Sequence, residues 1–141
     1  MSDMKKILVP VDFSANSDKL VNYAAAYAAK FPASLSLLNV IENPLAYEGL
    51  VSAKFNEELK AAMESKMNKL IDEHGDKCDI SETKVVIGDT VDSILEAAKK
   101  YDMIIIGTHG YRGLEKILMG SVAERVVKNA PCPVLVYNPY Q

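Results

Sequence analysis

The sequence predicts an α/β protein with a doubly wound, five-stranded parallel sheet and four helices. Short runs of apolar, branched residues, such as the Met-Ile-Ile-Ile run at 103–106, are typical of strands buried on both faces. Longer segments between these runs repeat their apolar residues every three or four positions, as amphipathic helices do. The two kinds of segment alternate along the chain, and such alternation calls for parallel strands joined by right-handed helical crossovers.

The first strand is expected at 5–11, a brief apolar run after two lysines. Ser14 then opens a helix whose apolar positions recur as far as Phe31. Pro32 ends that helix, because proline cannot continue the backbone hydrogen bonding.

The second strand is expected at 34–40, followed by a surface loop over 42–49. The longest helix covers 51–74 and carries an apolar seam that begins at Phe55. Gly75 supplies its stop. His74 at the helix end is expected either to interact with the helix dipole or to have no specific role.

The second half of the chain repeats the alternation. A strand at 80–87 precedes a helix that Thr90 can cap, with apolar residues on one face. The strand at 103–106 is followed by a helix at 121–129 and a last strand at 133–136. The predicted order is therefore β-α-β-α-β-α-β-α-β.

Length and composition indicate one folded domain over 1–141. The chain is 49% hydrophobic and 25% charged, close to globular averages. Its net charge is −3, without a Lys/Arg cluster, so we expect no nucleic-acid partner. No apolar window reaches about 18 residues and 1–10 lacks an export signal, so we expect a cytoplasmic protein with no membrane association. Cys78 and Cys132 are expected to be reduced, as buried or half-buried side chains.

Ligands of doubly wound sheets bind outside the carboxyl ends of the strands, where the winding direction reverses. If the first and fourth strands are neighbours, Pro10, Val11 and Asp12 lie beside Gly107. This edge of the sheet is the expected functional site.

A glycine-rich loop begins at that edge. Gly107 and Gly110 are separated by two residues, and nine further residues lead to Gly120 and Ser121 at the start of the last predicted helix. Glycines let a phosphate approach the main chain, and a helix N-terminus offers unpaired N–H donors with the positive end of the dipole. The pattern predicts an anion cradle for a phosphate.

The spacing is neither a Walker A motif nor GxGxxG. Taken alone, the loop leaves open that its glycines only make turns and that Gly120-Ser121 only starts a helix. Other segments of the sequence help to decide between a phosphate site and a set of simple turns.

Four segments together resemble the universal stress protein family over nearly the whole chain. They are Pro-Val-Asp-Phe-Ser at 10–14, Gly88 with the helix residues 94–98, the complete G-x2-G-x9-G-S motif from Gly107 to Ser121, and Pro-Cys-Pro-Val-Leu-Val at 131–136. The resemblance implies an adenine nucleotide α-hydrolase-like, Rossmann-like fold. Family members with an intact glycine motif bind ATP or related adenine nucleotides, so ATP or AMP, with or without Mg²⁺, is the expected ligand.

The resemblance also implies the binding residues. The residues carried over are Pro10, Val11, Asp12 and Val40 around base and ribose, and Gly107, Thr108, His109, Gly110, Arg112, Gly113, Gly120, Ser121 and Val122 around ribose and phosphates. Some alternatives remain open. Asp12 could instead cap the first helix, and His109 and Arg112 could face solvent.

The expected function is a stress-response module that couples adenine nucleotide levels to a partner or to dimer state. No catalytic constellation is visible, so slow ATP hydrolysis is only a hypothesis, and turnover above about 1 s⁻¹ would contradict this interpretation. A phospho-acceptor switch is disfavoured because Asp12 lacks an acidic neighbour. A homodimer through the last strand, 134–137, is expected, and a pure interaction module without nucleotide is the alternative.

Overall fold

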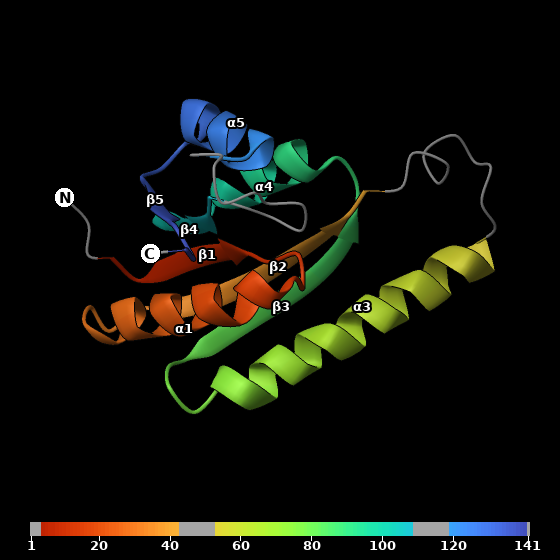
Figure 1. Ribbon diagram of the computed structural model, residues 1–141, viewed down its shortest axis with the longest axis horizontal. Coiled ribbons are helices and arrows are strands. Elements are labelled where there is room, and N and C mark those ends of the chain that lie inside the picture. Colours follow the sequence, from red (N-terminus) through yellow and green to blue (C-terminus); the bar gives the residue numbers. More distant parts are fainter. Residues whose placement is uncertain (1–3, 43–52, 109–118, 141) are drawn as a thin grey trace.

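The computed structural model describes residues 4–42, 53–108 and 119–140. Five strands form one sheet in the order β3-β2-β1-β4-β5, and every neighbouring pair is parallel (Figure 1). The strands are β1 (Lys6–Pro10), β2 (Ser34–Ile41), β3 (Ile80–Ile87), β4 (Met103–Gly107) and β5 (Val134–Tyr137). The predicted sheet is confirmed, and β1 and β4 are the neighbours at which the winding reverses.

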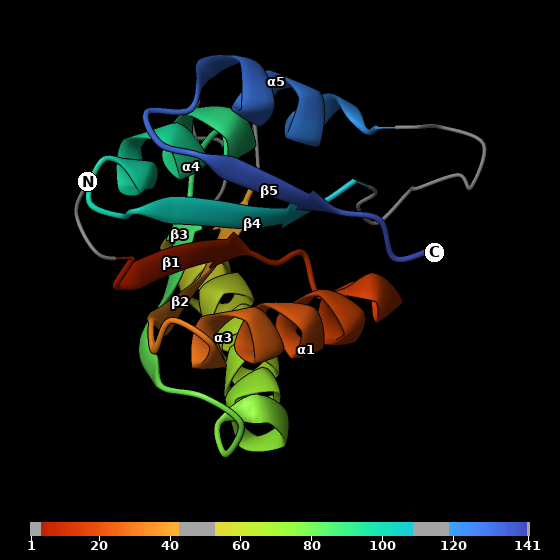
Figure 2. The same cartoon turned by 90° about the vertical axis from the view of Figure 1, so that its left-hand side faces the viewer.

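Helices cover both faces of the sheet (Figure 2). On one face lie α1 (Ala15–Ala29) and α3 (Ala53–His74), and on the other lie α4 (Thr90–Ala98) and α5 (Ser121–Asn129). The doubly wound arrangement is therefore confirmed. No described helix is both long enough and apolar enough to cross a membrane.

Two hydrophobic cores lie on opposite faces of the sheet, and neighbouring residues of one strand serve different cores. Ile104 belongs to the core beneath α4 and α5, whereas Ile105 belongs to the core beneath α1 and α3. Both isoleucines are fully buried. Successive strand residues point to opposite faces, so a strand covered on both sides must be apolar throughout. This explains the uninterrupted apolar run at 103–106.

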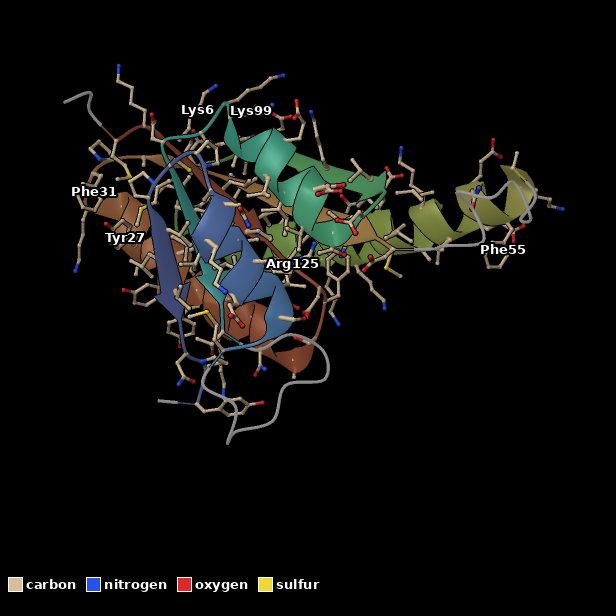
Figure 3. The ribbon with its side chains drawn as sticks, turned by 90° about the horizontal axis from the view of Figure 1, so that it is seen from above. Lys6, Tyr27, Phe31, Phe55, Lys99 and Arg125 are labelled. Carbon is tan, nitrogen blue, oxygen red and sulfur yellow. The ribbon has the colours of Figure 1, made fainter. Side chains whose placement is uncertain are left out.

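Two aromatic residues predicted on apolar seams are largely exposed. Phe55 is 49% exposed and Phe31 45% exposed. At 22 residues, α3 is about 33 Å long and β3, at eight residues, about 27 Å, so the first turns of α3 extend past the sheet (Figure 1). Figure 3 shows Phe55 near that far end. Phe31 lies two residues after the end of α1, and its ring packs at a tilt against that of Tyr27, with 4.8 Å between the ring centroids.

The capping residue of α4 differs from the prediction. Asp89, not Thr90, occupies the N-cap position, and its carboxylate accepts a hydrogen bond from the backbone N–H of Asp92 at 2.9 Å. Thr90 is the first helical residue, and its hydroxyl bonds elsewhere. Aspartate and threonine are both good N-caps, so the sequence alone did not separate them.

The predicted stop of α3 and the predicted half-buried position of the cysteines are confirmed. The N–H of Gly75 donates to the carbonyl of Ile71 at 2.7 Å, directly after α3 ends. Cys78 and Cys132 are free thiols, both half-buried. Burial raises the pKa of both thiols.

Candidate functional site

A cleft of about 580 Å³ opens at the carboxyl ends of β1, β2, β4 and β5. The first residues of α1, α4 and α5 border it, because each of these helices begins where a strand ends. Small-molecule sites in proteins occupy roughly 300–1,000 Å³, so the cleft is large enough for a nucleotide. Its lining residues are Pro10, Val11, Asp12, Ser14, Asn16, Ser17, Leu20, Leu38, Val40, Glu42, Thr90, Ile94, Ile106, Gly107, Thr108, Gly120, Ser121, Val122, Ala123, Tyr137 and Pro139.

Most of the predicted site residues line this one cleft. They are Pro10, Val11, Asp12, Val40, Gly107, Thr108, Gly120, Ser121 and Val122. The remaining four, His109, Gly110, Arg112 and Gly113, lie outside the described residues. Segments far apart in the sequence therefore meet at one edge of the sheet.

The start of α5 offers backbone donors to the cleft. The N–H of Gly120, predicted to be unpaired, instead donates to the carbonyl of Thr108 at 2.6 Å. Within the described residues, the N–H groups of Ser121, Val122 and Ala123 have no hydrogen-bond partner, as is usual for the first turn of a helix. These donors and the positive end of the α5 dipole make a site for a negatively charged group.

The turn from β1 into α1 is tightly held. The N–H of Val11 donates to the carbonyl of Leu38 at 2.8 Å, and the buried amide of Asn39 donates to the carbonyl of Val11 at 2.9 Å. Phe13 has φ 62°, in the left-handed region that non-glycine residues seldom adopt. Such strain persists only where surrounding contacts hold it, and it is often found at ligand sites.

Asp12 supports the start of α1 without being its N-cap. The N-cap is Ser14, whose side chain makes no capping bond. Oδ1 of Asp12 accepts hydrogen bonds from the N–H of Ser14 at 2.9 Å and from the hydroxyl of Ser17 at 3.2 Å. Both bonds use Oδ1, and Asp12 lines the cleft. The structural and the ligand-facing interpretations of this residue are therefore compatible.

The charged side chains among the described lining residues of the cleft are all negative. Among the described lining residues, the charged side chains are Asp12 and Glu42, and both are acidic. Carboxylates accept hydrogen bonds and repel phosphate. A phosphate therefore belongs beside α5, and ligand groups that donate hydrogen bonds belong beside Asp12 and Glu42.

Sequence reasoning missed several lining residues, including Glu42, Thr90, Tyr137 and Pro139. Each follows or ends a strand, so the rule that ligands bind at the carboxyl ends of strands could have found them once the strand order was known. Nζ of Lys19 on α1 donates to the carbonyl of Pro139 at 3.4 Å, which ties the chain after β5 to α1.

A second polar cluster lies away from the cleft, between α1 and α3. Side-chain atoms of Asp18, Glu73 and His74 that could coordinate a metal lie within 4.8 Å of one another, close enough to share one ion. Nζ of Lys77, however, lies 3.2 Å from Nδ1 of His74. An ammonium only donates, so Nδ1 accepts and the Nε2 proton is directed at Asp18, 3.1 Å away. This proton and the nearby positive charge disfavour a cation, and we interpret the cluster as an interhelical tie.

The sequence prediction for His74 was incomplete. His74 is buried, and it joins the end of α3 to Asp18 on α1, a contact that the prediction did not include. The pKa of the Asp18 carboxyl is lowered, and this hydrogen bond is the largest cause of the shift. A contact between residues 56 positions apart has no local sequence signal.

Comparison with known protein families gives a match to the model of the universal stress protein family over residues 4–138. Universal stress protein MJ0531 of Methanocaldococcus jannaschii is 41% identical over 141 aligned residues, which cover 94% of this chain and 81% of that protein. Universal stress protein A homolog 1 of Coxiella burnetii is 36% identical, with 93% of this chain and 94% of that protein covered.

Solved structures share the fold over almost the whole chain. The protein MJ0577 superposes with a TM-score of 0.82 at 29% identity, covering 97% of both chains. A universal stress protein in complex with cAMP gives 0.72 at 23% identity, covering 98% of this chain and 99% of that chain. A universal stress protein from Archaeoglobus fulgidus in complex with dAMP gives 0.65 at 20% identity, covering 96% and 98%.

Proposed function

Because this chain belongs to the universal stress protein family, we propose that its cleft binds an adenine nucleotide, ATP or AMP, with or without Mg²⁺. The protein then acts as a cytoplasmic regulatory module in the stress response, passing the level of nucleotide to a partner or to its own dimer state. The observation that carries the proposal is the first turn of α5, which lines the cleft and whose N–H groups have no hydrogen-bond partner among the described residues.

The phosphates are assigned to this turn. Ser121, Val122 and Ala123 each offer a backbone N–H, and Ser121 adds a hydroxyl. The helix dipole contributes about 0.3–1 kcal/mol, which is far less than the roughly 8 kcal/mol of micromolar binding. The remainder must come from hydrogen bonds to the several N–H groups and from burial of the base and ribose.

The base and ribose are assigned to the carboxyl ends of β1 and β2. Adjacent strands lie about 4.8 Å apart, so β2 lies about 10 Å from β4 with β1 between them. A nucleotide with its phosphate at α5 therefore extends past Asp12, which can accept from a ribose hydroxyl, toward Val40. Leu38, Ile94 and Ile106 supply apolar surface for the base.

Related proteins support the ligand class. Two universal stress proteins of the same fold have been solved in complex with cAMP and with dAMP, and both ligands are adenine nucleotides. They share an adenine base and a phosphate, which are the two parts that the opposite ends of the cleft would hold.

A pair of variants at Ser121 tests the phosphate assignment. Ser121→Pro removes the N–H and the hydroxyl, whereas Ser121→Ala removes the hydroxyl alone. Proline suits the first position of a helix, and the extended backbone of Gly120 (φ −71°, ψ 164°) suits the residue before a proline. The fold should therefore survive both changes.

We expect isothermal titration calorimetry to show a further loss of roughly tenfold in affinity for ATP and AMP in Ser121→Pro beyond that in Ser121→Ala. Circular dichroism checks that both variants fold. Equal affinities in the two variants would contradict a backbone contact at this position.

We also propose that the protein is a homodimer through β5. This strand is at one edge of the sheet. The carbonyls of Pro133 and Tyr137 accept hydrogen bonds from the β4 side at 3.0 and 2.9 Å, so the backbone groups of Val134 and Val136 point away from the sheet. Unpaired groups at a sheet edge favour pairing with another strand.

Light scattering at micromolar concentration tests the dimer. The wild type is expected at twice the monomer mass. Val136→Pro removes one outward N–H and should shift the mass toward the monomer, with thermal unfolding as the check on its fold. A wild-type mass of one chain would overturn this proposal while leaving nucleotide binding untouched.

A further inference from the structure

Glu42 lies where the cleft would receive the edge of the base, and the sequence did not point to it. It directly follows β2, which ends at Ile41, and it lines the cleft two residues after Val40. The N–H of Gly88 donates to the carbonyl of Ile41 at 3.0 Å, so the ends of β2 and β3 are joined at this point. The backbone that carries Glu42 is therefore held in place.

The carboxylate of Glu42 is also held, by the first residue of α4. The hydroxyl of Thr90 donates to Oε2 of Glu42 at 3.0 Å, and both residues line the cleft. Thr90 does not cap α4, because Asp89 does so, and its hydroxyl is therefore available for this bond. Thr90 bonds to Oε2, and no described residue is seen to bond to Oε1, so Oε1 is the oxygen that can meet a ligand.

The position of Glu42 relative to the phosphate end identifies the ligand group that it would meet. The phosphate donors lie at the start of α5, after β4, and Asp12 follows β1. Glu42 follows β2, one strand further along the same line and about 10 Å from β4. On an extended purine nucleotide, this is the end of the base farthest from the phosphate.

We propose, resting on the function proposed above, that Glu42 held by Thr90 is a specificity-determining residue that selects a 6-aminopurine. Its carboxylate oxygen accepts a hydrogen bond from the 6-amino group and repels the carbonyl oxygen that a 6-oxopurine carries at the same place. A carboxylate with both oxygens free could bind the two neighbouring N–H groups of guanine. The Thr90 bond competes with that pairing at one of the two oxygens and so favours a ligand with a single donor.

Three nucleotides test the assignment by isolating the group at C6. AMP carries the amino donor, inosine monophosphate carries a carbonyl oxygen with an N1–H donor beside it, and purine riboside monophosphate carries only hydrogen. For the wild type, calorimetry should give the affinity order AMP, purine riboside monophosphate, inosine monophosphate, with roughly a tenfold difference or more between first and last. The middle ligand separates lost attraction from added repulsion.

Glu42→Gln should change the preference rather than the binding as a whole. The glutamine carbonyl can still accept from Thr90, which directs the amide NH₂, a donor, toward the base. The ratio of AMP to inosine monophosphate affinity should therefore fall to about one or reverse. Thr90→Val removes the tether and should reduce the ratio without reversing it. Glu82→Gln on β3, whose carboxylate lies 3.2 Å from Nζ of Lys84 and does not line the cleft, should leave the ratio unchanged.

The outcomes separate this inference from the proposed function. Equal wild-type affinities for AMP and inosine monophosphate, or a ratio unchanged in Glu42→Gln, would overturn the role of Glu42 and leave nucleotide binding standing. Absence of binding by all three nucleotides to the folded wild type would overturn the proposed function and this inference with it.

Discussion

The N–H of Gly120 donates to the carbonyl of Thr108 at 2.6 Å, joining the residue after β4 to the residue before α5. This bond closes the base of the segment that carries the glycine motif. It also helps to fix where α5 begins, and thereby the position of the N–H groups in its first turn. A Cβ at Gly120 would lie 3.1 Å from the same carbonyl oxygen, which is closer than most side chains approach.

Substitution of Gly120 should therefore weaken nucleotide binding more than it weakens the fold. The backbone angles of Gly120 suit any residue, so the difficulty is the contact and not the conformation. We expect Gly120→Ala to bind several-fold more weakly and Gly120→Val to lose measurable binding in calorimetry, with both variants folded by circular dichroism.

Gly75→Ala is the matched control for that experiment. A Cβ at Gly75 would lie 2.7 Å from the carbonyl oxygen of Ile71, a worse contact, but Gly75 follows α3 and does not line the cleft. This variant should lose stability, by roughly 1–3 kcal/mol, and keep its affinity at a temperature where it is folded. A stable Gly120→Val protein with wild-type affinity would contradict the account of Gly120.

The hydrogen bonds that Oδ1 of Asp12 accepts should stabilise the start of α1. Asp12→Asn keeps an oxygen that can accept from Ser14 and Ser17, so its free energy of unfolding should fall by less than about 0.5 kcal/mol. Asp12→Ala leaves the buried hydroxyl of Ser17 without that partner and should cost about 1–2 kcal/mol in chemical denaturation. Equal stabilities of the two variants would show that the bonds to Oδ1 contribute nothing.

The contact between Asp18 and His74 predicts a dependence of stability on pH. The pKa of Asp18 is lowered in the folded protein, first by the hydrogen bond from His74, so its contribution is present above the ordinary carboxyl pKa and is lost as pH falls through the folded value. At pH 7 the free energy of unfolding of the wild type should exceed that of Asp18→Asn by only about 0.5–1 kcal/mol, because the exposed carboxylate is screened by solvent. Urea denaturation should show this difference shrinking as pH falls below the ordinary carboxyl pKa of about 3.9 and vanishing once Asp18 is protonated in the folded protein as well; a difference that does not change with pH in this range would exclude the titration of Asp18 as its source.

The cysteines should react slowly with alkylating reagents. Burial raises the pKa of Cys78 and Cys132, so the reactive thiolate is scarcer at pH 7.4 than in an unfolded chain. Mass spectrometry after iodoacetamide treatment should show slower labelling of the native protein than of the urea-unfolded protein. Equal rates at both cysteines would mean that neither thiol is protected.

The sequence was sufficient for the fold because the relevant signals are local. Strands buried on both faces need continuous apolar runs, as at 103–106, and helices need apolar residues three and four positions apart. The predicted place of the site depended on β1 and β4 being neighbours in the sheet, and the two strands are indeed paired. The nine predicted site residues that line the cleft lie at or near the ends of strands and helices, whose order along the chain was predictable.

What the sequence could not supply depends on contacts between distant segments. The pairing of Glu42 with Thr90 spans 48 positions, and that of Asp18 with His74 spans 56. Neither contact leaves a pattern in the local sequence, because each forms only when the fold brings two distant segments together. The left-handed backbone at Phe13 was equally hidden, since phenylalanine gives no preference for that conformation.

Calorimetric titration of the folded wild-type protein with AMP and with ATP, with and without Mg²⁺, tests the central claim most directly. The account predicts saturable binding of one nucleotide per chain with a dissociation constant of about 1–100 µM. If no adenine nucleotide binds even at millimolar concentration, the cleft beside α5 is not a nucleotide site.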